Sequence, residues 1–253
     1  SIIGEDCRGA QLGGVFCVAD MVDGIQAAGT ISVADSVHGM QLSGTVGVSR
    51  AVAGTQLSGT VGAAHRVDGA MVAGVVCGAH SVHGIVMSGV ANGVKELDGT
   101  SIAGVVGVNT RAHGTAISGV VNVADTMQGV QIAGVVNKAR YSKGLQFTSL
   151  LNITGELHGV QLSVINIADS CRGAQIGIFN YVRKGYHYFE LSGDETFYAN
   201  LAYRTGMPYV HSIFQFSMRP QTFTPLVWAV GYGLGTTIGK RKVRFEVDVT
   251  AHS

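Results

Sequence analysis

The stretch Gly129-Val-Gln-Ile-Ala-Gly-Val-Val-Asn-Lys-Ala139 contains the pattern that determines the fold, because it returns every fifteen residues along most of the chain. Its leading glycine recurs at Gly9, Gly24, Gly39, Gly54, Gly69, Gly84, Gly99, Gly114, Gly129, Gly144 and Gly159. A last copy begins at Gly173, fourteen residues after Gly159. A fixed period of this kind is typical of repeat architectures, in which each unit stacks on its neighbours.

Each repeat has a preferred residue type at most of its positions, which we number from this glycine as position one. Positions four, eight and fourteen are mostly large and apolar, position three prefers glutamine, and position six is usually glycine. The alternation predicts extended chain with even positions on one side and odd positions on the other. Position seven, valine in most repeats, is then expected to face away from positions four and eight. A strand that is apolar on both sides needs a partner on both sides, either a second copy, another protein chain or lipid.

The period also predicts the strand direction. Antiparallel strands would place alternate turns at opposite ends and would give a natural period of two repeats, whereas a parallel stack repeats with every coil. We therefore predict an all-β fold, a parallel β-solenoid of about twelve 15-residue coils followed by a C-terminal antiparallel β segment. In this stack, Gln11, Gln26, Gln41 and Gln56 form a column whose side-chain amides can bond to one another.

The composition changes near residue 180, where aromatic residues and all three prolines become concentrated. We expect a repeat domain over residues 1–183 and an aromatic-rich antiparallel β segment over residues 184–253. Alternating strands are predicted at 196–203, 209–218, 226–237 and 242–250. The segment would either cap the solenoid or contribute to an outer-membrane-type barrel or sheet. The structural alternative is a sixteen-stranded barrel, built from twelve repeats and four later strands.

Charge and hydropathy restrict the partners. Charged residues make up 13% of the chain and the net charge is +1, without the basic patch that binding to nucleic acid requires. There is no uninterrupted apolar stretch of eighteen residues, as a transmembrane helix would need. The expected partners are therefore a second copy or another protein on the apolar solenoid face, with the outer membrane as an alternative.

Histidines and carboxylates supply few candidates for chemistry. His65 and His80 lie one coil apart at position twelve, and His83 follows across the turn, so the three could hold zinc or nickel. The alternative interpretation is that they are solvated turn residues, because no carboxylate or cysteine completes the set. The aspartates recur at positions twelve and fifteen and are expected to cap turns. We predict no catalytic residue and no cofactor, because a fifteen-residue coil leaves no long loop to build a cleft.

Hydroxyl side chains suggest a weak ligand-binding surface. Thr30, Ser43, Thr45, Ser58 and Thr60 recur in neighbouring coils, where they could bind ice or a glycan. Valine replaces threonine in later coils, so these residues also fit ordinary strand positions. The four cysteines are expected to be small buried or half-buried thiols without disulfides.

The later coils resemble a known group of proteins. Gly159-Val-Gln-Leu-Ser-Val-Ile-Asn166 and Gly173-Ala-Gln-Ile-Gly-Ile-Phe-Asn180 are similar to the G-x-Q-I-G-x-x-N coils of bacterial surface-repeat proteins in Bacteroidetes and spirochaetes. This resemblance implies a bacterial cell-surface or outer-membrane location, and no functional residue is carried over from it. We therefore expect a non-enzymatic scaffold or interaction surface, with an ice- or glycan-binding solenoid as the alternative.

Overall fold

The computed structural model describes residues 2–192, 199–207, 210–219, 227–240 and 243–252. Every regular element in these ranges is a β-strand. The described residues include no helix with the length and apolar character needed to cross a membrane. The chain divides into two compact units, Ser1–Ser149 and Leu150–Ser253. Each unit is considered separately below.

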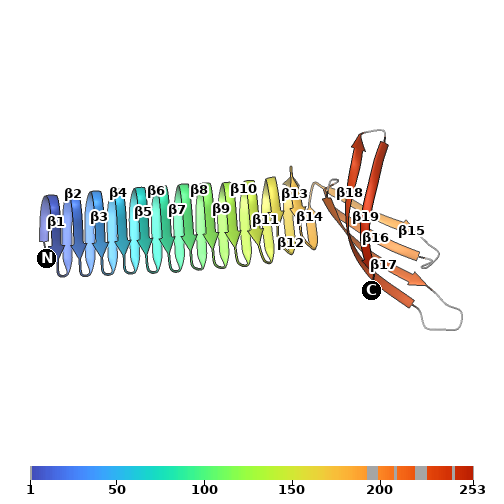
Figure 1. The fold of residues 1–253 in the computed structure, drawn as a ribbon, viewed down its shortest axis with the longest axis horizontal. Coiled ribbons are helices and arrows are strands. Elements are labelled where there is room, and N and C mark those ends of the chain that lie inside the picture. The colour runs from blue at the N-terminus through green and yellow to red at the C-terminus, as the bar shows by residue number, and fades with distance from the viewer. Residues whose placement is uncertain (1, 193–198, 208–209, 220–226, 241–242, 253) are drawn as a thin grey trace. The chain divides into compact units, whose positions relative to one another are not determined.

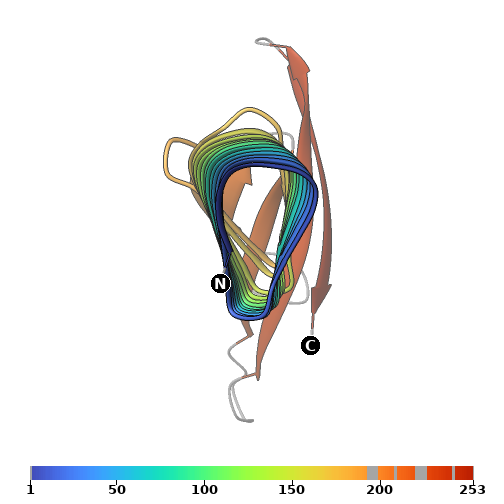
Figure 2. The same ribbon diagram turned by 90° about the vertical axis from the view of Figure 1, so that its left-hand side faces the viewer.

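The first unit consists of ten strands, each of which provides almost a whole coil. They are β1 (Ile2–Gly13), β2 (Phe16–Ala28), β3 (Ile31–Ser43), β4 (Val46–Ser58), β5 (Val61–Ala73), β6 (Val76–Ser88), β7 (Ala91–Ala103), β8 (Val106–Ser118), β9 (Val121–Ala133) and β10 (Val136–Thr148). Figure 1 shows them stacked in sequence order, and Figure 2, which looks along the stack, shows successive coils lying nearly over one another.

Neighbouring coils pair in parallel, as the period predicted. Gln11 lies opposite Gln26, and Gly84 lies opposite Gly99, so equivalent positions share one column. The pairing omits position twelve, where Arg50 and His65 would meet, and resumes at position thirteen. Position twelve forms a corner of the coil. The alternation of inward and outward side chains changes phase there, because the buried residues on its two sides are at positions eleven and fourteen, three residues apart.

Two glycine columns turn the chain. The position-one glycines from Gly9 to Gly159 have φ angles between 103° and 156°, a region that favours glycine. The position-six glycines open a two-residue bend whose backbone is tied to the coil before it. At this bend Val105 N donates to Val90 O at 2.9 Å, and Val106 N donates to the same oxygen at 3.0 Å. The turns are therefore short, and no long loop leaves the stack in the first unit.

The interior is narrow and is filled mostly by small or amide side chains. Buried residues occupy positions three, five, nine, eleven and fourteen, represented in coil β9 to β10 by Gln131, Ala133, Asn137, Ala139 and Ser142. The predicted glutamine column is formed in its first three members, because Gln26 Nε2 and Gln41 Nε2 each donate to the preceding Gln Oε1 at 2.9 Å. Gln56, the fourth, is buried but has no such bond within the described residues.

The expected facing of the large apolar residues was wrong. Position fourteen lies inside, as at Val37, but positions four, seven and eight all point outward, as at Leu42, Val75 and Val76. A coil of fifteen residues encloses too little space for five large side chains. Alanine, serine, valine and amides therefore form most of the interior, joined at position fourteen by single larger residues such as Leu97 and Met127, whereas the large residues of positions four, seven and eight remain half-buried or exposed outside.

The second unit contains the last coils and an antiparallel sheet. Its strands are β11 (Leu151–Leu162), β12 (Ile165–Cys171), β13 (Ala174–Ile176), β14 (Phe179–Val182), β15 (Tyr186–Ser192), β16 (Ala199–Met207), β17 (Val210–Arg219), β18 (Val227–Lys240) and β19 (Val243–His252). Strand β11 pairs in parallel with β12 and β13, and β12 pairs in parallel with β14. Strands β15 to β19 form one antiparallel sheet in sequence order. Over the described residues, the four predicted strands agree with β16 to β19 within a few residues, whereas β15 was not predicted. Residues 196–198, 209, 226 and 242 of the predicted strands lie outside the described ranges.

The antiparallel sheet packs against the last coil. Asn180 Nδ2 donates to Ser212 Oγ at 2.9 Å, and Tyr232 Oη donates to Gly177 O at 3.0 Å. The rings of Phe179 and Phe214 lie 5.7 Å apart between centroids. These contacts cover the side chains of β14 within the second unit, as a cap would do.

The outer side of this sheet is apolar. Leu191, Leu201, Phe216 and Val230 lie in register across four strands, and all four are exposed. The opposite side is buried and more polar, and it includes an ion pair in which Arg204 Nη2 lies 2.6 Å from Glu190 Oε2. Apolar residues outside and polar residues inside reverse the usual order of a water-exposed sheet.

The position-nine glycines provide a test of the interior packing. A Cβ at Gly47 would lie 2.5 Å from Ser58 Oγ and 2.6 Å from Ser43 Oγ, whereas at Gly62 the nearest atom would be Met71 Cγ at 3.5 Å. We expect Gly47→Ala to lower the free energy of unfolding by about 1–3 kcal/mol through overpacking. Gly62→Ala should raise it by about 0.4–1 kcal/mol, because alanine restricts the unfolded chain. Denaturant unfolding followed by circular dichroism measures both, and a larger loss for Gly62→Ala would contradict this packing.

Candidate functional site

The outside of the solenoid has one charged face and two apolar faces. We call positions twelve, thirteen and fifteen the polar face, and positions two, four, seven, eight and ten the apolar faces. Nearly all charged residues of the coils lie on the polar face. Within the described coils, Lys138 is the one charged residue on the apolar faces. This separation gives the fold two distinct kinds of surface.

Ion pairs join successive coils along the polar face. Arg50 Nη1 lies 3.2 Å from an Asp35 carboxylate oxygen, and Arg140 Nη2 lies 3.5 Å from Asp125 Oδ1. In each pair, both residues occupy position twelve and are fifteen apart, so parallel stacking brings opposite charges together. Exposed pairs of this kind contribute about 0–1 kcal/mol each. Their main effect is that positive and negative charges neutralise each other along the polar face.

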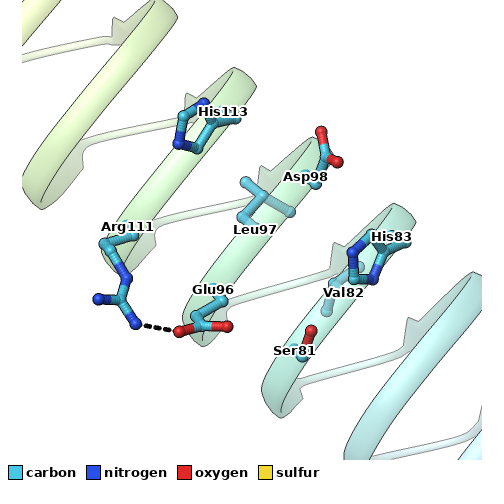
Figure 3. A pocket seen from close by; sticks show the side chains of 8 residues that line it. All are labelled: Ser81, Val82, His83, Glu96, Leu97, Asp98, Arg111 and His113. Atoms are coloured by element: carbon cyan, nitrogen blue, oxygen red, sulfur yellow. Dashed lines mark hydrogen bonds and ion pairs between the residues drawn. The ribbon is translucent and has the colours of Figure 1, made fainter.

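A shallow groove on the polar face is lined by Ser81, Val82, His83, Glu96, Leu97, Asp98, Arg111 and His113. Figure 3 shows Arg111 and Glu96 pointing toward each other as an ion pair, while His83, Asp98 and His113 follow one another along successive coils. Acids and bases alternate here and are already paired in part, because His83 Nδ1 also lies 3.4 Å from Asp68 Oδ1. The groove therefore presents little unbalanced charge to a ligand.

The three histidines of the predicted metal site lie in neighbouring coils, but their side chains have different surroundings. The rings of His65 and His80 stack with centroids 4.6 Å apart and an interplanar angle of 20°, whereas His83 is directed at Asp68. Stacked imidazoles face each other with their π surfaces, while their ligating nitrogens lie in the ring planes. Among the described residues, no group of three or more His, Cys, Asp or Glu is arranged to hold a metal ion.

The predicted hydroxyl surface is divided between the inside and the outside. Ser43 and Ser58 are buried at 7% exposure, with their Oγ atoms 3.2 Å apart. Thr30, Thr45 and Thr60 are half-buried at the outer bend. The five predicted hydroxyls therefore do not share one face, because position five points inward and position seven outward. A ligand outside the solenoid would meet three threonines.

A second recess, which sequence reasoning missed, lies where an apolar face meets the polar face. It is lined by Val48, Ser49, Ala63, Ala64, His65, Gly78, Ala79, His80 and Lys95. The floor of the recess is low because Gly78 has no side chain there. A Cβ added at Gly78 or at Gly93 would meet nothing within 4 Å. The stacked imidazoles and Lys95 form one wall. The sequence signal was the loss of large residues at position ten in the coils that carry these bases at position twelve.

All four cysteines are free, and three of them are buried. Burial raises the pKa of the Cys77 and Cys171 thiols to about 11, and burial also raises the pKa of Cys17. Each buried thiol therefore stays protonated at neutral pH. The stability gained by burying the neutral thiols is present below the ordinary thiol pKa and is lost as pH rises toward 11.

Thiol reactivity should separate Cys7 from the other cysteines. At pH 8 we expect one fast-reacting thiol per native chain, Cys7, because it is half-buried while the others are enclosed and protonated. An aromatic disulfide reagent followed by absorbance measures the number of reacting thiols, and denaturant should release all four. Cys7→Ser should remove the fast phase. Two or more fast thiols in the native protein would contradict the described burial.

Several carboxylates on the polar face pair with arginines of the same or a neighbouring coil, as Asp35 does with Arg50 and Asp125 with Arg140. Comparison with known proteins finds no matching family model, no matching curated protein and no matching solved structure.

Proposed function

We propose that this protein is a non-enzymatic scaffold of the bacterial cell surface or outer membrane, whose apolar faces bind a protein partner. The observation that supports the proposal most is the separation of charge around each coil. Two outer faces are rich in valine, isoleucine and leucine through at least ten coils, and apart from Lys138 the charged residues lie on the third face. Monomeric soluble proteins rarely leave contiguous apolar patches of this extent in water.

The regularity of the coils favours a passive role. Bends of two residues leave no loops from which a catalytic cleft could be built, and the repeated surface offers many equivalent contacts instead. The partner is either a second copy of this chain or another protein, and the outer membrane is the alternative partner. The exposed apolar row Leu191, Leu201, Phe216 and Val230 on the antiparallel sheet would meet the same kind of partner. No nucleic acid is expected, because acids and bases nearly balance.

The partner can be tested on the purified full chain. We expect light scattering in buffer without detergent to show oligomers, or the protein to require detergent to remain in solution. Placing charge on one apolar face, with Val105→Lys and Val120→Lys together, should shift the mass toward the monomer. The matched control is Thr110→Lys and Thr126→Lys on the polar face, which should leave the mass unchanged. A detergent-free monomer for the unmodified chain would overturn the proposed partner.

The location needs a separate test on cells that produce the protein naturally. Antibodies against the purified chain should label intact cells, and external protease should remove the signal. Labelling that appears only after the cells are opened would overturn the surface location.

A further inference from the structure

The recess beside His65 and His80 departs from the repeat at two positions in the same coils. Position ten is valine in the preceding coils but becomes Ala63, Gly78 and Gly93 in three successive coils. Position twelve is aspartate at the start of the chain but becomes His65, His80 and Lys95 in those coils. One change lowers the floor and the other adds nitrogen donors along its edge.

We propose that this recess binds an acidic glycan, with carboxylate groups of the sugar chain bound by His65, His80 and Lys95. The three side chains occupy one column, so their backbones are about 4.8 Å apart from coil to coil. A linear ligand lying along the solenoid axis would therefore meet a donor at each step. Arg and Lys side chains and imidazole N–H groups are the usual donors to carboxylates.

The charge around the recess favours an anion. Among the described residues that line it, none is a carboxylate. Arg50 and Arg66 nearby are paired with Asp35 and Asp68, whereas no ion pair is found for Lys95 within the described part of the chain. The ammonium group and the imidazole donors are thus available, in contrast to the groove at Arg111, where acids and bases alternate.

The backbone under the recess favours a glycan over a peptide. Strands β5, β6 and β7 are paired with neighbours on both sides, so there is no open sheet edge to which a peptide could add as a strand. A glycan needs no such edge, since its ring faces can lie on a shallow surface of glycine and alanine. Its hydroxyl and carboxylate groups would reach the donors along the wall.

Restoring the repeat provides a direct test in the full chain. Gly78→Val with Gly93→Val gives both positions the residue of other coils, and neither added Cβ meets an atom within 4 Å. This variant should fold normally and lose binding, because valine fills the recess. A second variant, Lys95→Met, should weaken binding at least tenfold, whereas Lys138→Met, three coils away at position ten, should leave it unchanged. Circular dichroism melting confirms that each variant is folded.

The probes are a galacturonic acid oligosaccharide, a neutral galactose oligosaccharide of the same length, and a glutamate-rich peptide, measured by calorimetry. Binding of the acidic glycan alone, lost in the recess-filling variant, is the expected result. The proposal is overturned if no probe binds at millimolar concentration, if the neutral glycan or the peptide binds as well, or if filling the recess has no effect. The test is independent of the scaffold proposal, because its readout is ligand binding by the purified chain.

Discussion

Replacing Gly104 by alanine is expected to prevent the solenoid from folding or to lower its free energy of unfolding by more than about 4 kcal/mol. The added Cβ would lie 1.9 Å from Gly89 O and 2.8 Å from Gly89 C in the coil before it. These are backbone atoms, and the coil spacing is held by bonds such as Gly104 N to Ser88 O at 3.1 Å. A Cβ at Gly104 would therefore force this bend to shift, and the paired strands before and after the bend resist that shift.

Gly93→Ala is the matched control for this substitution. Gly93 lies in strand β7, whereas Gly104 lies in a bend, and a Cβ at Gly93 would point outward and meet nothing within 4 Å. We expect its free energy of unfolding to rise by no more than about 1 kcal/mol, because alanine restricts the unfolded chain. Denaturant unfolding by circular dichroism compares the two, and similar values for both variants would contradict the close stacking.

The second large effect is expected from Gln41→Met. Gln41 Nε2 donates to Gln26 Oε1 at 2.9 Å, and Gln41 Oε1 accepts from Ser49 Oγ at 2.7 Å, with Gln41 fully buried. Methionine is similar in size but leaves both of these partners without a bond. Each buried polar group that loses its partner costs about 1–3 kcal/mol, so the free energy of unfolding should fall by about 2–5 kcal/mol.

Gln56→Met provides the contrast to Gln41→Met in the same column. Gln56 is fully buried, neither of its amide atoms has a partner among the described residues, and the next coil already carries Met71. We expect this substitution to be neutral or to stabilise the chain by up to about 3 kcal/mol, since it removes an unpaired polar group. Equal losses for the two variants in urea melts would show that the amides contribute by volume alone.

The direction of the coils could be predicted because it follows from symmetry. Glycine recurs once per coil rather than once per hairpin, and only a parallel stack places Gly84, Gly99 and Gly114 in equivalent surroundings. The glutamine column followed from the same reasoning. Strand β15 was missed because its residues, Tyr186 to Ser192, do not alternate clearly between apolar and polar.

The inside and the outside could not be assigned from hydrophobic size. Leu42 and Val46 suggest core positions by type, yet Gln41 and Ser43 are the buried residues. The width of the coil determines which side chains fit inside. This width depends on the glycine conformations and on the corner at position twelve, which are three-dimensional properties. A residue preference for the core assumes a space large enough to accept the side chain.

The candidate sites could be predicted only in part, because the sequence does not show which side chains point inward and which point outward. The stacking of His65 and His80 follows from their spacing, but the separation of Ser43 from Thr45 depends on which way each side chain points. The recess at Gly78 was visible in the sequence as two simultaneous departures from the repeat. It required the structure to show that positions ten and twelve border one hollow.

The fourteen-residue coil shows how such a chain can change length. It lacks the position-six glycine, yet Asn152 Nδ2 still donates to Asn166 Oδ1 at 3.0 Å and Gln175 Nε2 to Gln161 Oε1 at 2.7 Å. One residue can thus be deleted at the bend without breaking these columns, whereas a deletion within a strand would shift the buried side chains out of their columns. Duplication or loss of a whole coil in the gene would likewise keep every column aligned. Length polymorphism among natural variants should therefore occur in whole coils, with single-residue changes confined to that bend.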